Sequence, residues 1–300
     1  METPLSREEL LEKIKNKENV STVNTSLIDD MSYLFSGDKK YHKRGLNFNQ
    51  PLNSWDVSNV KTMKGMFNYA QSFNQPLDEW DVSSVENMYF MFSYAINFNQ
   101  PLNSWNVSKV KIMSGLFDHA FDFNQPLDRW DVSNATNMRA MFCGAHRFNQ
   151  PLTSWDVSKV KVMAVMFCMA TSFNQPLNNW NVSNVTTMES MFDHAESFNQ
   201  PLNDWDVSNV TNMQQMFCGA ESFNQPLNDW DVLNVTNMQW MFYGAKRYVH
   251  SFKNWNMKAC NLDGFLRNCP AWHMHNTEDD LPVSYGRRVY IRNTTVWKVL

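Results

Sequence analysis

The chain has 300 residues, a formal net charge of −4 and a sequence pI near 6.0, so it lacks the basic surface expected of a nucleic-acid-binding protein. No apolar run approaches the roughly 18 residues that a membrane span needs, and the charged first segment does not resemble a secretory signal. The chain has five cysteines, and this odd number favours a reducing compartment over a disulfide framework.

Residues 1–47 are predicted to form an N-terminal cap. Leu10, Leu11 and Ile14 lie one to four residues apart and predict an amphipathic helix. A degenerate half repeat is then indicated by the spacing of Ser26, Ile28, Met31, Leu34 and Phe35. Short charge runs are common on protein surfaces, so a solvated loop is favoured over a phosphate site for the basic residues that follow. These are Lys39, Lys40, His42, Lys43 and Arg44.

Residues 48–272 are predicted to hold nine 25-residue repeats, the last of them degenerate. The segment FNQPL begins at Phe48 and returns every 25 residues as far as Phe223, without an insertion or a deletion. Trp55 recurs with the same period as far as Trp255. Such a strict period indicates a stack of equivalent structural units.

Each repeat is predicted to contain one strand and one helix. Apolar and polar residues alternate around Trp55, which predicts a strand over residues 53–57. From Val60 the apolar residues are spaced three or four apart, which predicts a helix over residues 59–70. Ser58 precedes this segment as a candidate N-cap residue. In the second repeat, Ser83 and Glu86 have the spacing of a capping box.

A strand and a helix of this size cannot bury their apolar faces alone, so the repeats are expected to stack. The predicted fold class is α/β, a solenoid with one parallel β-sheet and the helices on the opposite face. The tryptophans are expected to form one buried column. Asn49 and Gln50 recur in eight repeats and are expected to form ladders of side-chain amides.

Residues 273–300 are predicted to form a C-terminal cap with a β-hairpin, because two β-prone runs flank the segment NTT. Around the start of this cap, Cys260, Cys269, His273 and His275 offer metal-binding residue types. Their spacing matches no common zinc finger, and both cysteines occupy positions that hold core residues in other repeats. We therefore predict no metal site and no cofactor, and we expect reduced cysteines.

No catalytic residues are predicted. The segment FDHA occurs twice and places a carboxylate beside an imidazole at Asp118–His119 and at Asp193–His194, as acid–base catalysis requires. The two copies lie three repeats apart, which is about 14 Å at a strand spacing near 4.8 Å. They cannot act on the same substrate atom, so an enzyme is not expected.

The residue after each repeat tryptophan is Asp or Asn and is expected to face outward. The column reads Asp56, Asp81, Asn106, Asp131, Asp156, Asn181, Asp206, Asp231 and Asn256. The favoured interpretation is that these side chains cap helix N-termini. Recruitment of cations or of a basic partner and specific calcium binding are the alternatives. The candidate partner-binding residues of this column are Asp56, Asp81, Asp131 and Asp156.

The repeats differ mainly at the positions equivalent to residues 61–62, 64–65, 68–69 and 71–72. A unique partner would have to bind these positions. Large apolar residues replace polar ones there, at Tyr89, Phe90, Ile96, Phe121, Val165, Met169 and Trp240. Such residues either contact a partner or fill gaps between neighbouring helices. The candidate partner-binding residues of this group are Tyr89, Phe90, Phe121 and Trp240.

The stretch FNQPLNSWDVSNVKTMKGMF, which begins at Phe48, resembles a leucine-rich-repeat-related family with repeats of roughly this length. These repeats occur in BspA-like and mycoplasma-type bacterial surface proteins and in large DNA viruses. The shared motif is W-[DN]-V-S-x-V-x-x-M-x-x-M-F, and the likeness extends from Ser26 to Trp272. The resemblance implies a right-handed, leucine-rich-repeat-like solenoid with a role in binding or adhesion and no catalytic residues.

Together these features predict a non-enzymatic scaffold for protein–protein interactions. It is expected to be a monomer with a protein partner of unknown identity, without a membrane span and without a nucleic-acid partner. Its expected location is the host cytoplasm or a virus particle. The alternative is a secreted or surface adhesin-like module, which would need a signal upstream of Met1.

Overall fold

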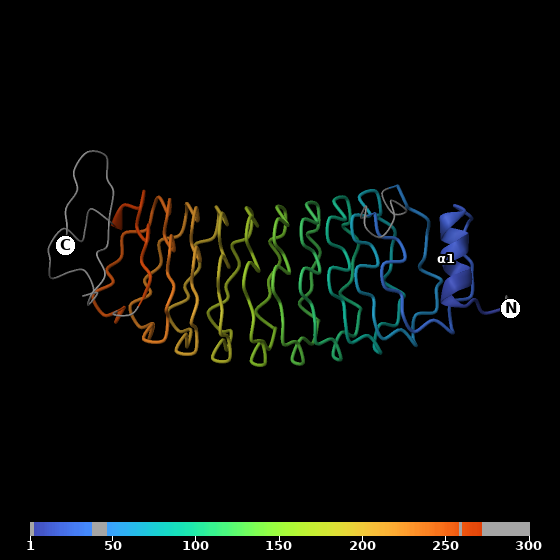
Figure 1. The fold of residues 1–300 in the computed structure, drawn as a ribbon, viewed down its shortest axis with the longest axis horizontal. Coiled ribbons are helices and arrows are strands. Elements are labelled where there is room, and N and C mark those ends of the chain that lie inside the picture. Colours follow the sequence, from blue (N-terminus) through green and yellow to red (C-terminus); the bar gives the residue numbers. More distant parts are fainter. Residues whose placement is uncertain (1–2, 38–46, 258–259, 272–300) are drawn as a thin grey trace. The chain divides into compact units, whose positions relative to one another are not determined.

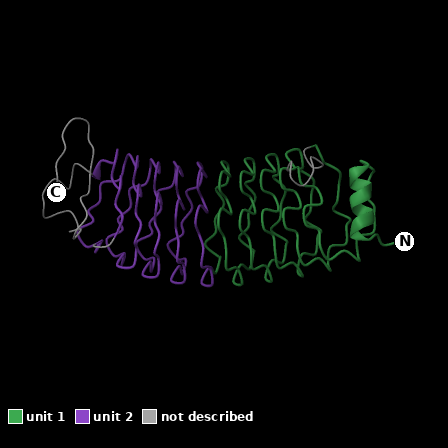
Figure 2. Ribbon diagram, in the orientation of Figure 1, with its two compact units in different colours: residues 1–156 green, residues 157–300 purple. Residues whose placement is uncertain are grey.

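The computed structural model describes residues 3–37, 47–257 and 260–271. The chain divides into two compact units, residues 1–156 and residues 157–300 (Figure 2). Within each unit every repeat forms one coil of the backbone, and successive coils lie side by side (Figure 1). The repeats therefore stack within each unit.

Unit 1 begins with helix α1, Arg7–Lys15. Ser6 caps it with a capping box, in which the Ser6 hydroxyl accepts from the Glu9 amide at 3.2 Å and the Glu9 carboxylate accepts from the Ser6 amide at 2.8 Å. Leu10 and Ile14 are buried. The predicted N-terminal helix is confirmed. No helix of the described ranges is long and apolar enough to span a membrane.

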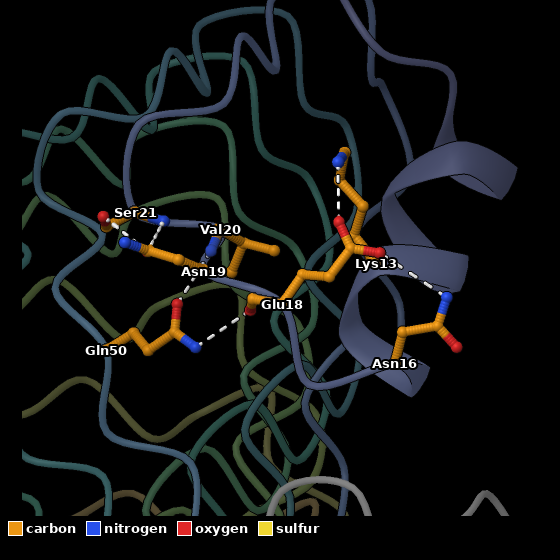
Figure 3. Close-up of polar contacts among 7 residues, drawn as sticks. All are labelled: Lys13, Asn16, Glu18, Asn19, Val20, Ser21 and Gln50. Carbon is orange, nitrogen blue, oxygen red and sulfur yellow. Dashed lines mark hydrogen bonds and ion pairs between the residues drawn. The ribbon is translucent and has the colours of Figure 1, made fainter.

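The side chain of Gln50 joins the segment after α1 to the first full repeat (Figure 3). Its Oε1 accepts from the Val20 amide at 2.8 Å, and its Nε2 donates to the Glu18 carbonyl oxygen at 3.1 Å. The Glu18 carboxylate in turn pairs with Lys13 Nζ at 2.8 Å. One side-chain amide thus satisfies two backbone groups of the N-terminal segment.

The predicted α/β fold class is wrong. Helix and strand each account for only 4% of the structure, and the described repeats form no sheet. They meet instead through single-residue parallel bridges, such as Thr62 with Asn87 in unit 1 and Val162 with Thr187 in unit 2. A solenoid with a parallel sheet and helices on the opposite face is therefore not the architecture of this chain.

Two turns replace the strand predicted over residues 53–57. The Trp55 amide donates to the Leu52 carbonyl oxygen at 3.0 Å, which closes the first turn. Asp56 Oδ1 then accepts from the Ser58 amide at 3.0 Å, which makes an Asx turn. A side chain that bonds its own backbone competes with a strand, so the chain bends directly after the tryptophan.

A run of tight turns replaces the helix predicted over residues 59–70. The amides of Met66 and Ala70 each donate to the carbonyl oxygen three residues earlier, at 3.1 and 2.9 Å. The third residue of each turn has a positive φ, +56° at Gly65 and +59° at Tyr69. Positive φ at this position belongs to type II turns and ends an α-helix. Consecutive turns place apolar side chains three and four residues apart, as a helix would.

The other amides of this segment bond the next repeat. The amides of Met63, Gly65, Phe67 and Tyr69 donate to carbonyl oxygens 24 residues later, at 2.7 to 2.9 Å. Alternate amides therefore close a turn or join two coils. This pattern satisfies the buried backbone without extended strands or helices.

Aromatic columns form the core of each unit. In unit 1 the rings of Trp80, Trp105, Trp130 and Trp155 stack with centroids 6.3 to 6.4 Å apart. In unit 2 the rings of Trp205, Trp230 and Trp255 stack at 6.5 and 6.1 Å. These rings are at most 3% exposed. The predicted tryptophan column is confirmed within each unit.

Each of these indoles also bonds the backbone of the preceding repeat. The Nε1 atoms of Trp80 and Trp105 donate to the carbonyl oxygens of Leu52 and Leu77, both at 2.8 Å. In unit 2, Trp205, Trp230 and Trp255 make the same bond at 2.9 Å. A buried N–H needs an acceptor, so this bond sets the register between neighbouring repeats.

The amide ladders predicted for Asn49 and Gln50 are confirmed. Asn49 Oδ1 accepts from the Asn74 amide at 3.0 Å and from Gln75 Nε2 at 3.2 Å. The same contacts recur in unit 2, where Asn174 Oδ1 accepts from the Asn199 amide at 2.9 Å. Each asparagine thus satisfies the backbone of the following repeat.

The degenerate ends contact the neighbouring repeats where the structure describes them. The amide of Met31 donates to the Thr62 carbonyl oxygen at 3.0 Å, so the N-terminal half repeat joins the stack of unit 1. In the last repeat, Tyr248 stacks on Phe223 with centroids 5.8 Å apart. The predicted basic loop residues, 39–44, and the predicted C-terminal hairpin, 273–300, lie outside the described residues.

Replacing Trp105 by Phe should lower the free energy of unfolding by about 2 kcal/mol or more, because the Leu77 carbonyl oxygen loses its buried donor and the smaller ring leaves a void. Urea unfolding followed by circular dichroism measures the change. Trp240→Phe is the matched control, since this ring is 37% exposed, and its effect should be clearly smaller than that of Trp105→Phe. Equal losses in the two variants would contradict the importance of the indole bond.

Deleting residues 123–147 should leave the protein folded and monodisperse. The deletion rejoins equivalent positions, so the Trp155 indole meets the carbonyl oxygen of Leu102 in place of Leu127. Deleting residues 123–134 joins unlike positions and should cause aggregation. Size-exclusion chromatography and circular dichroism compare the two proteins. Aggregation of both would show that the repeats are not interchangeable.

Candidate functional site

Two clusters of Asp, His and Cys occupy equivalent positions in the two units. They consist of Asp118, His119 and Cys143 in unit 1 and of Asp193, His194 and Cys218 in unit 2. In each cluster the possible ligand atoms all lie within 4.8 Å of one another. A search of the described residues for three or more metal-ligating side chains finds these two groups.

The tight turns of neighbouring repeats position the cluster of unit 1. His119 has a φ of +55°, and its amide donates to the Cys143 carbonyl oxygen at 2.6 Å. Gly144 holds the position of His119 one repeat later. A Cβ atom at Gly144 would lie 3.0 Å from Cγ and Cδ2 of His119, which is closer than such atoms normally approach. Glycine therefore leaves room for the imidazole.

The carboxylate of Asp118 is the centre of the cluster in unit 1. Its Oδ1 lies 2.6 Å from His119 Nδ1, and its Oδ2 accepts from the Ser93 hydroxyl at 3.3 Å. Asp118 and Cys143 are buried, whereas the His119 side chain is 26% exposed. Tyr94 stacks on the imidazole with centroids 4.4 Å apart. The cluster is thus covered on one side and reachable through the histidine.

In unit 2 the carboxylate of Asp193 lies 2.6 Å from His194 Nδ1, and the thiol of Cys218 lies within 4.8 Å of both groups. Burial, followed by the nearby Asp193, raises the pKa of Cys218 to about 12. Burial also raises the pKa of Asp193. Without a bound cation the thiol stays protonated at neutral pH. A buried thiol with a raised pKa is the opposite of an activated nucleophile.

The cysteines of these clusters were not predicted as site residues. The sequence identifies the two Asp–His pairs only as possible acid–base pairs. The missing signal is that each FDHA segment is followed one repeat later by Cys–Gly, at Cys143 and Cys218. These cysteines occupy the positions of Asp118 and Asp193 in the next coil.

The predicted role of the Asp and Asn column as helix caps is wrong, because a turn rather than a helix follows each tryptophan. Asp56 and Asp131 accept from the amide two residues later, both at 3.0 Å. Hydrogen bonds from the hydroxyl and amide of Ser83 lower the pKa of Asp81. Asp156 is exposed and is the last residue of unit 1. The described part of this column contributes to no metal-ligating group of three.

The capping box predicted for Ser83 and Glu86 is also wrong. Ser83 donates its amide to Asp81 Oδ1 at 3.0 Å. Glu86 accepts from Lys111 Nζ of the next repeat at 2.9 Å. Both residues therefore belong to turns and to contacts between repeats.

Phe90 and Trp240 cover glycines of the following repeat. A Cβ atom at Gly115 would lie 2.4 Å from Phe90 Cε1, and one at Gly264 would lie 2.0 Å from Trp240 Cδ1. The rings thus fill space that the glycines leave open. For these two candidates the gap-filling interpretation is favoured, although the neighbouring elements are turns rather than helices.

Tyr89 and Phe121 remain near the surface. The ring of Tyr89 meets Phe90 edge-on with centroids 4.4 Å apart, and Lys64 Nζ lies 5.4 Å from its centroid. Phe121 lies 4.8 Å from the ring of His146 and 5.9 Å from that of His119. Phe121 is thus adjacent to the cluster of unit 1.

The C-terminal cysteines and histidines are described only in part. Cys269 is buried, and its thiol donates to the Tyr248 carbonyl oxygen at 3.6 Å. Cys260 is partly exposed. His273 and His275 lie outside the described residues. All five cysteines of the chain are free thiols in the structure.

Comparison with known proteins gives one family. A family model described as a Mycoplasma protein of unknown function, DUF285, matches residues 6–129, 101–196 and 176–273. The overlapping matches are those expected of a repeated sequence. A comparison with curated proteins finds no match.

Replacing Asp81 by Ala should lower the free energy of unfolding by about 1 kcal/mol, because the Ser83 amide loses its acceptor. Asp81→Asn is the matched control. It keeps Oδ1, and Asn already makes this turn at Asn106 and Asn181. The free energy of unfolding should fall clearly less in Asp81→Asn than in Asp81→Ala. Equal losses in urea unfolding at neutral pH would show that the Asx turn is not what Asp81 contributes.

The pH dependence of the same variants isolates the charge of Asp81. The pKa of Asp81 is lower in the folded state, so its charge adds stability above the unfolded pKa, and this is lost as the pH falls through the folded pKa. The stability difference between the natural protein and Asp81→Asn should therefore shrink in acid. A difference that stays constant with pH would contradict a role for the charge.

Proposed function

The chain belongs to the DUF285 family of repeat proteins, and we propose that it acts as a non-enzymatic scaffold for protein–protein interactions. The proposal rests on one observation: a row of stacked, partly exposed rings in the segment where the repeats differ. We call this row, Tyr69, Tyr94 and His119, the ring row of unit 1. Its partner is expected to be a protein that offers apolar and hydrogen-bonding groups together.

The ring row is ordered by contacts on both sides. Tyr94 stacks on Tyr69 and on His119, with centroids 4.4 Å apart in both pairs and planes within 6°. The backbone beneath is held by bonds to the next repeat, at 2.7 Å from Tyr69 to Ser93 and at 2.7 Å from Tyr94 to Asp118. Preorganised aromatic side chains lose little entropy on binding, which is typical of strong contacts at interfaces.

The surroundings of the ring row add polar groups. Phe121 lies next to His119, and His146 lies next to Phe121 in the same unit. The Tyr94 hydroxyl is protonated at neutral pH, as in any tyrosine, and can donate a hydrogen bond; burial raises its pKa further. Tyrosine and histidine offer both an apolar ring and a polar tip, which suits a surface exposed before binding.

The proposal of a non-enzymatic role is supported by the chemistry of the Asp–His–Cys clusters. A nucleophilic cysteine needs a lowered pKa and a base within hydrogen-bond reach. Burial and the nearby Asp193 carboxylate raise the pKa of Cys218 instead. The five free thiols also support an intracellular setting, where cysteines stay reduced.

Site-specific photo-crosslinking tests the proposal. Benzoylphenylalanine placed at Tyr94 should capture a discrete protein partner from cells, whereas the same group at the exposed Glu79 of the same unit should not. The captured protein is then purified, and its affinity for the full chain is measured by calorimetry. Equal capture at both positions would show non-specific contact and would overturn the proposal.

The affinity of the purified partner for variants gives the decisive result. Tyr69→Asn and Tyr94→Asn remove the rings, and asparagine tolerates the positive φ at both positions. The double variant should bind at least about tenfold more weakly, which is about 1.4 kcal/mol. Glu79→Asn should bind normally. Unchanged binding by a double variant that is folded by circular dichroism would exclude the ring row as the interface.

A further inference from the structure

The two Asp–His–Cys clusters hold the donor atoms of a transition-metal site. Each offers a carboxylate oxygen, an imidazole nitrogen and a thiol sulfur, all within 4.8 Å of one another. Zinc binds these three donor types at roughly 2.0 to 2.3 Å, which places tetrahedral donors about 3.5 Å apart. Small side-chain rotations would therefore bring the three donors onto one ion.

The carboxylate lies beside both other donors of the cluster. In unit 2, His194 Nδ1 lies 2.6 Å from the Asp193 carboxylate, and the Cys218 thiol lies within 4.8 Å of both groups. A cation among the three donors takes the place of the protons between them. The thiol releases its proton to solvent, and a neutral imidazole keeps its proton on Nε2 while Nδ1 binds the metal. The thiolate and carboxylate then balance a doubly charged ion.

The repeat context shows that the cluster is a recurring arrangement. Asp–His is followed one repeat later by Cys–Gly in both units. A Cβ atom at Gly219 would lie 2.8 Å from His194 Cδ2, so the glycine makes room for the imidazole. The turn itself does not require a glycine in the repeat that follows a ring. Tyr94 is equivalent to Gly219, and it stacks directly on the ring of Tyr69 one repeat earlier. Cys and Gly thus accompany the Asp–His pair.

The two clusters differ in how well their ligands are held. In unit 1 the Ser93 hydroxyl donates to Asp118 Oδ2, and Tyr94 covers the His119 ring. The His119 side chain is 26% exposed, whereas that of His194 is 54% exposed. Partners behind the ligands orient them and raise metal affinity, so the cluster of unit 1 should bind the more tightly.

We propose that each cluster binds one divalent transition-metal ion of the zinc type through Asp, His and Cys. Three protein ligands leave the fourth position open to water or to a ligand from a bound protein. This proposal does not depend on the scaffold function, because its test needs no partner. It also gives the Asp–His pairs a role other than acid–base catalysis.

Cobalt(II) titration of the metal-free full chain provides the test. Cobalt bound to a thiolate gives a charge-transfer absorption that unbound cobalt lacks. The natural chain should bind two ions with this absorption, and zinc should displace them. Absence of the thiolate–cobalt absorption in the natural chain would overturn the proposal.

Variants assign the two ions. Cys143→Ser and Cys218→Ser should each leave one ion per chain, and the double variant should leave none. Cys269→Ser is the matched control, since this buried thiol bonds the Tyr248 carbonyl oxygen and lies outside both clusters. It should still bind two ions. If Cys143→Ser or Cys218→Ser still binds two ions, the cluster that contains the replaced cysteine is excluded as a metal site.

A second pair of variants covers the case in which a buried serine disturbs folding. His119→Gln and His194→Gln change partly exposed side chains and should keep the circular dichroism spectrum. Each should weaken cobalt binding at its own cluster at least about tenfold. Two folded histidine variants that bind both ions with natural affinity would show that the thiols bind cobalt without the clusters, and would overturn the proposal.

Discussion

The hydrogen bond from the buried indole of one repeat to a leucine carbonyl oxygen of the preceding repeat, as made by Trp80 and Trp205, is the contact on which the rest of the structure depends. It joins a side-chain column to the backbone, at 2.8 to 2.9 Å in the repeats described above. An indole N–H without an acceptor in the core would be costly, so a slip of one residue between repeats is strongly disfavoured. The aromatic columns, the asparagine ladder and the alternating backbone bonds all require this same register. A period of 25 residues without insertions is its consequence in the sequence.

The same register explains where the repeats can vary. Neighbouring coils are joined mainly by backbone amides and by side chains of the core, which leaves the positions of positive φ free to change. These positions hold a glycine in some repeats and a ring in others, and a ring such as Phe90 or Trp240 lies over the glycine that follows it. Ring and glycine therefore form a complementary pair across two repeats. An L-residue in this conformation costs about 1 to 2 kcal/mol, and the bonds on both sides of the turn hold it there.

The two proposals meet at His119. This residue ends the ring row of unit 1 and belongs to the Asp–His–Cys cluster of the same unit. A metal ion bound to its imidazole would hold the last ring of the row and would place an open coordination position beside it. In unit 2 the residue equivalent to His194 one repeat earlier is Met169, which is exposed. The equivalent clusters of the two units thus have different surroundings, so they would present different surfaces to a partner.

The sequence by itself determined the period, the buried columns, the amide ladders and the N-terminal helix, because burial recurs at equivalent positions and a capping box acts locally. It did not determine the secondary structure. Apolar residues three and four apart occur both on a helix and in consecutive tight turns, and only the positive φ of residues such as Tyr69 separates the two. Side chains such as Asp56 bond their own backbone and prevent a strand. The clusters also needed the tertiary structure, because Asp118 and Cys143 are distant in sequence and become neighbours only when the register brings equivalent positions of successive coils together.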